Sequence, residues 1–169
     1  LGRCIDYDAL KYKTVLEIGF GTGWFSKMII SSGVSSLDSV DLSETHLKLV
    51  QERFKDHSNA RFQLASAENL PFADASFDFV ASWGVIHHSP DTKKIVNEIY
   101  RILKSGGEAR IMIYHKWSIV GYMLWIRYAL LRLRPWLSLT FIYSNYLESP
   151  GTKAYTIQEA KKLFNKFSD

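Results

Sequence analysis

Three glycines and one aspartate near the start of the chain are the residues best suited to binding a nucleotide-like ligand. Gly19, Gly21 and Gly23 stand at alternate positions directly after a short apolar run. Glycine has no side chain to keep a ligand away from the backbone, so such a turn lets the chain approach a bound group closely. Asp41 lies 22 residues beyond Gly19, where a carboxylate can accept hydrogen bonds from both hydroxyls of a ribose. Together these residues predict a site for an adenosine-containing ligand.

The spacing of the glycines separates this turn from two other nucleotide-binding turns. Nicotinamide-dependent dehydrogenases use G-x-G-x-x-G, whereas this chain has G-x-G-x-G followed by Trp24. A P-loop is excluded because no Gly-Lys-Ser/Thr follows. A simpler role for Asp41 is to cap a helix that begins near Ser43, but the neighbouring glycine turn favours ligand binding.

The elements that must position these residues alternate between strands and helices. Short β-branched or apolar runs predict strands at 14–18, 37–41, 60–65, 77–82 and 108–113. Helical spacing and capping residues predict helices at 24–32, from Ser43, from Pro90 as first helical residue up to 105–107, and from 157 to about 167 behind a Thr156/Glu159 capping box. This order predicts an α/β fold: a Rossmann-like, doubly wound, mainly parallel sheet with helices on both faces and ligands beyond the carboxyl ends of the strands.

The 169 residues fit a single domain. We expect a cofactor-binding core at 13–114, a helical acceptor-binding or lid insertion at 115–150, and a C-terminal helix at 151–169. The chain opens on Leu1 rather than Met, so we expect the native protein to begin earlier, and the far end also looks cut.

Composition narrows the function classes. A net charge of +4 falls short of the dense basic stripe typical of a dedicated nucleic-acid binder. The single Cys4 excludes an internal disulfide and favours a reducing, cytoplasmic compartment. No run reaches the roughly 18 apolar residues of a membrane span. Because His46, His57 and His115 show no metal-ligand spacing with Cys4, we predict no metal site.

Six stretches match, in order, the motifs of one family: 15–23, 40–43, 67–72, 77–80, 85–91 and 98–107. From about Lys13 to Tyr114 the chain thus resembles the class I S-adenosylmethionine-dependent methyltransferases, of the type that acts on small molecules. The resemblance implies that S-adenosyl-L-methionine is the cofactor. It also implies the following contacts: Glu17 and the backbone of Gly19, Gly21 and Gly23 for the methionine part, Asp41 for the ribose, Leu42, Ala67 and Glu68 for the adenine, and Ser82 and Trp83 beside the sulfonium.

One position departs from the family pattern. Members usually carry Asp before the alanine of the third motif, where it accepts a hydrogen bond from the adenine amino group, and here Ser66 stands in that place. A hydroxyl can still accept this bond, although more weakly than a carboxylate. Glu68 is the alternative acceptor.

His87 and His88 follow the fourth predicted strand. Methyl transfer from a sulfonium depends mainly on aligning the reactants and excluding water, but a base helps when the acceptor is a hydroxyl or an acidic carbon. His87 is our candidate for that base. The alternative, that both imidazoles only pack or form hydrogen bonds near the cofactor, stays open.

The segment 117–147 lies where the family places its acceptor-binding elements. The chain has no Asp or Glu from Ala109 to Leu147, but it has five Lys/Arg residues and three Trp there. One helical face of this segment collects apolar residues, with arginines on another: Ile119, Met123, Ile126, Leu130 and Leu133 against Arg127 and Arg134. Three interpretations are open: a lid over a hydrophobic acceptor, an interfacial helix in peripheral contact with a membrane, and plain core or contact between subunits of a homo-oligomer.

The function predicted from sequence is methyl transfer from S-adenosylmethionine to a small, hydrophobic or lipid-like acceptor. A nucleic-acid methyltransferase is an alternative, but the Asn/Asp-Pro-Pro-aromatic motif of enzymes acting on base amino groups is missing after the fourth strand, where Ser82–Val85 stands. The other alternative is a catalytically silent module that binds an adenosine ligand. Ser66, in place of the usual Asp, is the reason to consider it.

Overall fold

The computed structural model describes residues 6–167, so Cys4 lies outside the described part. The chain divides into two compact units. The first unit takes the residues up to Trp83 together with Lys94–Met112, and the second takes Gly84–Lys93 and the residues from Ile113 onward.

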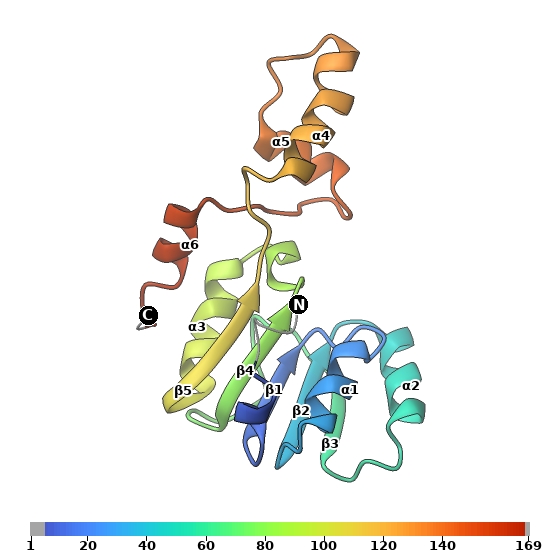
Figure 1. Ribbon diagram of the computed structural model, residues 1–169, viewed down its shortest axis with the longest axis vertical. Helices are drawn as coiled ribbons and strands as arrows, with labels where there is room; N and C mark the ends of the chain where they lie inside the picture. The colour runs from blue at the N-terminus through green and yellow to red at the C-terminus, as the bar shows by residue number, and fades with distance from the viewer. Residues whose placement is uncertain (1–5, 168–169) are drawn as a thin grey trace. The chain divides into compact units, whose positions relative to one another are not determined.

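The first unit is built on a parallel five-stranded sheet (Figure 1). The strands lie in the order β3-β2-β1-β4-β5, and every neighbouring pair is parallel. Their bounds are β1 Thr14–Ile18, β2 Ser36–Asp41, β3 Ala60–Leu64, β4 Phe77–Trp83 and β5 Leu103–Met112. Because the strand order reverses between β1 and β4, the carboxyl ends of these two strands mark the place where such sheets bind ligands.

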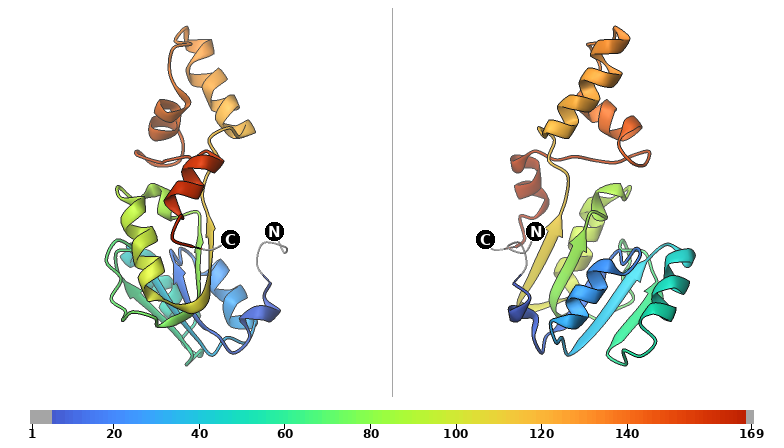
Figure 2. Two further views of the ribbon diagram at one scale, coloured as in Figure 1. Left: turned by 90° about the vertical axis from the view of Figure 1, so that its left-hand side faces the viewer. Right: turned by 45° about the vertical axis from the view of Figure 1, so that its right-hand side comes forward.

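Helices cover both faces of this sheet. From β1 the chain runs outward through α1 (Trp24–Ser31) to β2 and through α2 (Glu44–Arg53) to β3, and α3 (Thr92–Ile102) joins β4 to β5 in the opposite direction. Right-handed crossovers in opposite directions place their helices on opposite faces, which Figures 1 and 2 show for α1 and α2 against α3. The predicted α/β, doubly wound fold is confirmed.

Fully buried apolar side chains hold α1 to the sheet. Val15 on β1, Ile29 on α1, and Leu37 on β2 are each completely buried in one cluster. A second cluster joins α2 to the turn after β1, where Phe20 and Phe54 pack against the ring of Phe62. Strands β1 and β2 and the turn after β1 are therefore held by close packing against α1 and α2.

A polar network ties the sheet together where its strands begin. The Asp78 carboxylate on β4 accepts hydrogen bonds from the backbone and hydroxyl of Thr14 at 2.9 and 2.7 Å, and from the Lys104 ammonium at 2.8 Å. These donors favour the charged carboxylate, so they lower the pKa of Asp78 from 3.8 to about 2. The amino edge of the sheet is thus fixed by ionic hydrogen bonds.

The structure corrects three predicted boundaries. Helix α3 begins at Thr92, so Pro90 is not its first residue; a short 3-10 turn, η2 (Ile86–His88), comes before it. Residues 105–107 do not end the helix, because β5 already begins at Leu103 and carries these residues through a register shift opposite Phe77–Phe79. Helix α6 ends at Leu163, a few residues earlier than expected.

The second unit is helical. It contains η2, α4 (Ile119–Tyr128), η3 (Leu130–Arg132), α5 (Leu139–Tyr146) and α6 (Ile157–Leu163), which opens with the predicted Thr156/Glu159 capping box. Gly121 of α4 is buried against α5, where an added Cβ would overlap the hydroxyl of Tyr143. Within residues 6–167 no helix combines the length and the apolar character needed to cross a bilayer.

Two segments far apart in the sequence join to make this unit. The Lys153 amide donates to the His87 carbonyl at 3.0 Å, and the Lys153 ammonium donates to the Ser89 carbonyl at 2.9 Å. The Tyr155 hydroxyl donates to the Thr92 hydroxyl at 2.8 Å. These bonds attach Gly84–Lys93 to the strand-like segment that leads into α6.

Candidate functional site

The glycine turn directly follows β1, and its glycines serve different purposes. Gly21 has a left-handed φ of 48°, and a Cβ added there would find no atom within 4 Å. Gly23 has a φ of 80°, but its Cβ would come within 2.7 Å of Phe54 and 3.0 Å of Val50. Gly21 therefore leaves open space in front of the turn, whereas Gly23 lets α1 start close to α2.

Asp41, the last residue of β2, organises this turn. Its Oδ2 accepts a hydrogen bond from the Gly21 amide at 2.9 Å, and its Oδ1 accepts from the amides of Leu42 and Ser43 at 2.7 and 3.0 Å. A carboxylate offers roughly four acceptor positions, so Oδ2 keeps room for a further donor such as a ribose hydroxyl. The cap of α2 is Ser43, whose hydroxyl accepts from the His46 amide, so Asp41 is not needed for that task.

Glu17 on β1 is a buried acid with one unsatisfied oxygen. It is fully buried; its Oε2 accepts from the hydroxyls of Ser26 and Ser39 at 2.6 and 2.8 Å. Oε1 has no hydrogen-bond partner among the described residues. Burial raises the pKa of Glu17 to about 7, against the two serine bonds. A cationic N–H donor at Oε1, such as an amino acid ammonium, would satisfy this atom, so the site fits the methionine part of the expected cofactor.

The other predicted contacts also follow strand ends. Leu42, just beyond β2, is 76% exposed and offers an apolar surface for a base. The Ser66 hydroxyl after β3 accepts from the Glu68 amide at 3.2 Å, and Ala67 lies between them in this turn. The Ser82 hydroxyl of β4 is buried and donates to the Ile18 carbonyl of β1 at 3.2 Å.

Trp83, the last residue of β4, packs its ring 6.0 Å from that of Phe25, centroid to centroid. Ser82 and Trp83 therefore fasten β4 to its neighbours at the edge where the sulfonium is expected.

Sequence reasoning missed the residue that fixes the loop after β3. The Arg101 guanidinium donates to the carbonyls of Leu70 and Phe72 at 3.1 and 2.8 Å and forms ion pairs with Glu98 and Asp74. Glu98 in turn accepts from the Leu70 amide at 2.9 Å. Arg101 and Glu98 belong to a stretch that carries the family resemblance, but only the fold brings them to this loop, which also contains two of the predicted adenine contacts, Ala67 and Glu68.

The profile of the family described as "Methyltransferase domain" matches residues 16–111. The chain belongs to this methyltransferase family. Its members use S-adenosylmethionine as methyl donor, so the predicted family and cofactor are confirmed.

Relatives and solved structures agree with this assignment. The chain is 34% identical over 106 residues to phosphoethanolamine N-methyltransferase 2 of Caenorhabditis elegans, covering 62% of this chain and 24% of that protein. It is 31% identical over 111 residues to a ubiquinone/menaquinone biosynthesis C-methyltransferase of Klebsiella pneumoniae, covering 62% and 43%. The crystal structure of YcgJ from Bacillus subtilis has a TM-score of 0.70 at 25% identity and covers 95% of this chain and 64% of that one. The chain spans less than half the length of these two curated relatives.

In the second unit of this methyltransferase, His87 lies in η2, four residues beyond β4. Its side chain is fully buried, and neither ring nitrogen has a hydrogen-bond partner among the described residues. Its ring centroid lies 4.3 Å from that of His88 and 4.2 Å from that of Tyr114. Burial, followed by the neighbouring His88, lowers the pKa of His87 to about 4. The imidazole is therefore neutral at neutral pH.

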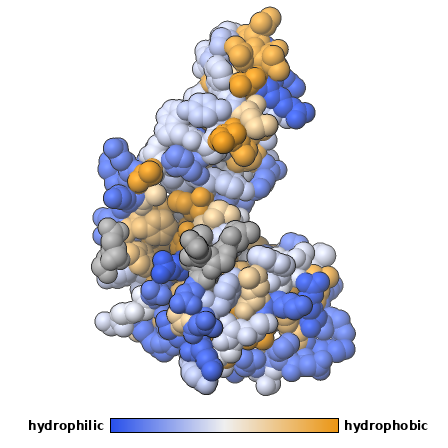
Figure 3. Space-filling view, in the orientation of Figure 1, coloured by the Kyte–Doolittle hydropathy of each residue, from blue (hydrophilic) through white to orange (hydrophobic). Residues whose placement is uncertain are grey.

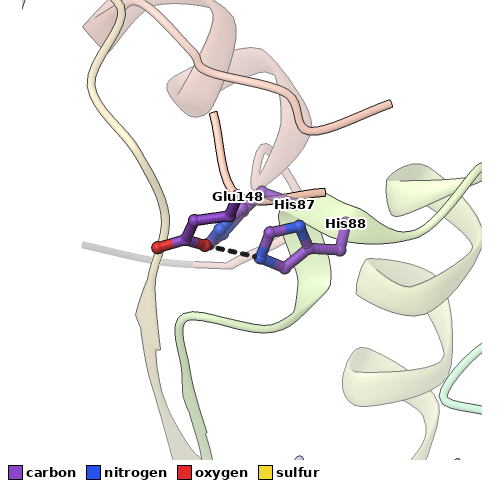
Figure 4. Close-up of side chains that lie close together, drawn as sticks. All are labelled: His87, His88 and Glu148. Atoms are coloured by element: carbon purple, nitrogen blue, oxygen red, sulfur yellow. Dashed lines mark ion pairs between the residues drawn. The ribbon is translucent and has the colours of Figure 1, made fainter. Parts of the chain in front are cut away.

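His88 faces a carboxylate that no sequence motif predicts beside it. Its Nε2 lies 3.2 Å from Oε2 of Glu148, which comes from the segment after α5 (Figure 4). The Tyr114 hydroxyl donates to Oε1 of Glu148 at 2.5 Å. No local spacing connects Glu148 with the histidines, so only the folded structure identifies it.

The second unit also contains a cavity of about 480 Å³. Its lining includes four lysines and a single acid: Lys93, Lys116, Lys153, Lys162 and Glu159. Tyr143 and Thr152 contribute to the same wall. The excess of positive charge suits a ligand that carries a phosphate or carboxylate.

The apolar face predicted on 117–147 is exposed in this structure. Ile119, Met123 and Leu133 are exposed by 80%, 63% and 84%. The face is therefore not part of the core of the second unit. Figure 3 shows apolar side chains gathered at the end of this unit that α4 and η3 form.

Proposed function

We propose that this chain binds S-adenosylmethionine at the carboxyl edge of its sheet and transfers the methyl group to a small acceptor. The observation that carries the proposal is the constellation of Asp41, Gly21 and Glu17. A carboxylate tied to an open glycine turn stands beside a buried acid with one unsatisfied oxygen.

Each of these residues takes one part of the cofactor. Glu17 Oε1 accepts from the methionine ammonium, the space at Gly21 admits the ligand, and Asp41 Oδ2 accepts from a ribose hydroxyl. Leu42 packs on the adenine. The bound cofactor supplies an activated methyl group on its sulfonium. The task of the chain is then to align donor and acceptor and to exclude water.

We propose that the second unit binds the acceptor. Its lysine-rich cavity favours an acceptor with an anionic group, and the exposed apolar face of α4 favours one with a lipid-like part. Two relatives support these classes by name, one a phosphoethanolamine N-methyltransferase and the other a C-methyltransferase of ubiquinone and menaquinone biosynthesis.

We further propose that α4 and η3 rest on an anionic membrane surface, from which a lipid-like acceptor can enter. Leu131 of η3 is 73% exposed, and Met123 of α4 is 63% exposed. Arg127 and Arg132 both lie 5.3 Å from the ring centroid of Tyr128, and neither forms an ion pair with a described acid. Apolar side chains bordered by unpaired arginines are the pattern that binds anionic lipid headgroups.

Liposome co-sedimentation tests the membrane contact. Binding should rise with the fraction of anionic lipid and fall with salt. Met123→Glu with Leu131→Glu should abolish it, whereas Ile157→Glu, at a 65% exposed site on α6, should leave it unchanged. Indifference of the wild-type chain to liposomes would leave the apolar face as a lid or a subunit contact.

Calorimetry with S-adenosylhomocysteine tests the cofactor site. Asp41→Ala should lose about 1.5–3 kcal/mol of binding free energy, the range for a hydrogen bond to a charged group. Asp38→Ala, three residues earlier on the same strand, is the matched control and should bind normally. Unchanged affinity in Asp41→Ala would refute the ribose assignment, as tight binding of NADH would refute the choice of cofactor. Turnover with a panel of acceptors then separates an enzyme from a silent binding module.

A further inference from the structure

Three side chains with metal-binding atoms converge in the second unit. His87 and His88 come from η2, and Glu148 from the segment after α5 (Figure 4). One ligand atom of each lies within 4.8 Å of those of the other two. All three residues belong to the second unit.

His87 is the unexplained member of the cluster. A neutral imidazole has one N–H donor and one acceptor nitrogen, yet the fully buried ring of His87 satisfies neither with a described residue. Buried polar groups without partners are rare, and they commonly mark a bound water, ion or ligand. The rings of His88 and Tyr114 pack against His87, but such contacts do not satisfy its nitrogens.

The surroundings of the other two side chains orient them as ligands. The Nδ1 of His88 lies 3.0 Å from the hydroxyl of Thr152 and 2.9 Å from that of Ser149, which leaves Nε2 directed at Glu148. The Tyr114 hydroxyl holds Oε1 of Glu148, which leaves Oε2 free to face Nε2. Metal-ligating histidines and carboxylates are held in this way by hydrogen bonds to the atoms that do not bind the ion.

We propose that His87, His88 and Glu148 form a binding site for a divalent transition-metal ion, with Zn²⁺ as the best match. Imidazole and carboxylate ligands about 2.0–2.2 Å from a zinc ion place their donor atoms roughly 3.3 Å apart in a tetrahedral site. Nε2 of His88 and Oε2 of Glu148 are already 3.2 Å apart. The His87 ligand atom lies within 4.8 Å of both, so it has to approach them by at most about 1.5 Å to complete a tetrahedral site. Two nitrogens and one oxygen favour Zn²⁺ over Mg²⁺, which prefers oxygen ligands.

This site changes the role expected for His87. An imidazole nitrogen that binds an ion has no lone pair left to take a proton, so His87 would be a ligand rather than the base predicted from the sequence. Three protein ligands leave a tetrahedral ion one open position. If the proposed methyl transfer also holds, an acceptor oxygen can occupy that position, where the ion lowers the pKa of a hydroxyl.

Metal binding is tested on untagged protein freed of metal by a chelator, in the absence of the methyl donor. Calorimetric titration with Zn²⁺ should give one ion per chain, and Co²⁺ should produce the visible absorption of a low-coordinate complex. Glu148→Gln and His88→Asn should each weaken Zn²⁺ affinity by at least about tenfold. His57→Asn removes an exposed imidazole outside the cluster and should bind Zn²⁺ like the wild type.

Glu148 is half exposed, so its substitution should not unfold the chain. A second measurement follows: at one fixed Zn²⁺ concentration, the melting temperature should rise by as much in His57→Asn as in the wild type, and by less in Glu148→Gln. Absence of bound Zn²⁺, or equal binding in all the variants, would overturn the proposal. Since no cofactor enters these titrations, this result is independent of whether S-adenosylmethionine binds.

Discussion

The buried Glu17 makes the stability of the methyltransferase depend on pH in a way that one substitution should remove. Its pKa is raised from 4.5 to about 7 in the folded chain by burial. Between these values the folded state binds more protons than the unfolded state, so the free energy of unfolding falls as pH rises through this window. At about 1.4 kcal/mol for each pH unit, the ionised form costs about 3 kcal/mol above pH 7.

Glu17→Gln keeps the shape of the side chain and an oxygen that can accept from Ser26 and Ser39, but it cannot ionise. Its amide nitrogen takes the position of the unsatisfied Oε1. The loss of stability from leaving this buried N–H group without an acceptor is the same at every pH. Between pH 5 and pH 8, the free energy of unfolding should therefore fall by about 2–3 kcal/mol more in the wild type than in Glu17→Gln.

Urea denaturation without cofactor at pH 5, 6, 7 and 8 measures this difference. Glu52→Gln, at an exposed site, is the control and should follow the wild type at each pH. If the free energies of unfolding of the wild type and Glu17→Gln differed by the same amount at every pH, burial would not raise the pKa of Glu17, and this reasoning would be refuted. Saturating S-adenosylhomocysteine should flatten the wild-type pH dependence, because a bound ammonium stabilises the carboxylate.

Four further substitutions test the roles of individual residues in cofactor binding and in stability. Gly21→Ala should lower the free energy of unfolding by only about 1 kcal/mol, the strain of its positive φ, but weaken S-adenosylhomocysteine binding in calorimetry. Gly23→Ala should instead destabilise the fold. The reverse pattern would refute the different roles assigned to the two glycines. Asp78→Asn should lower the free energy of unfolding, measured in urea at pH 7, by only about 1 kcal/mol, because the Asp78–Lys104 ion pair is partly screened by solvent. The lowered pKa of Asp78 means that its stabilising contribution is present above pH 3.8 and lost as pH falls through about 2. The loss caused by Asp78→Asn should therefore be about half as large at pH 3, and an equal loss at pH 3 and pH 7 would contradict this reasoning. Gly121→Ala should lower the melting temperature without changing cofactor affinity, since its Cβ would overlap a tyrosine of α5 in the second unit; an unchanged melting temperature would refute that packing.

The parts of the fold that depend on local sequence could be predicted closely. The strand Thr14–Ile18 and the Ser43 cap appear where the residue pattern placed them, because β-branched runs and capping hydroxyls act over a few residues. Gly106 and Gly107 misled the prediction. Glycine pairs usually end helices, but here Gly107 lies within β5, where the Asp78 carbonyl approaches the position of its missing Cβ to 3.2 Å. That approach depends on pairing with a distant strand, which a local pattern cannot reveal.

The candidate site shows the same division. Glu17 and Asp41 could be found from the sequence because a family motif contains them. Glu148 could not, because α4 and α5 lie between it and the histidines in the sequence, and only the fold brings them together. Helical spacing placed Ile119 and Leu133 on one helical face, but α4 ends at Tyr128, and Leu133 lies beyond it in a left-handed conformation. Periodicity also cannot tell a buried face from an exposed one.

The second unit is assembled from Gly84–Lys93 and from residues after Met112, joined by the bonds of Lys153 and Tyr155. A protein engineer therefore cannot graft it from one methyltransferase to another as a single contiguous cassette. A chimera that exchanges only the residues after β5 keeps the original η2. The backbone carbonyls in and after η2 must then still accept hydrogen bonds from the incoming residue at the position of Lys153. Changing acceptor preference by recombination then requires two coordinated exchanges, whereas point substitutions in the cavity can act singly.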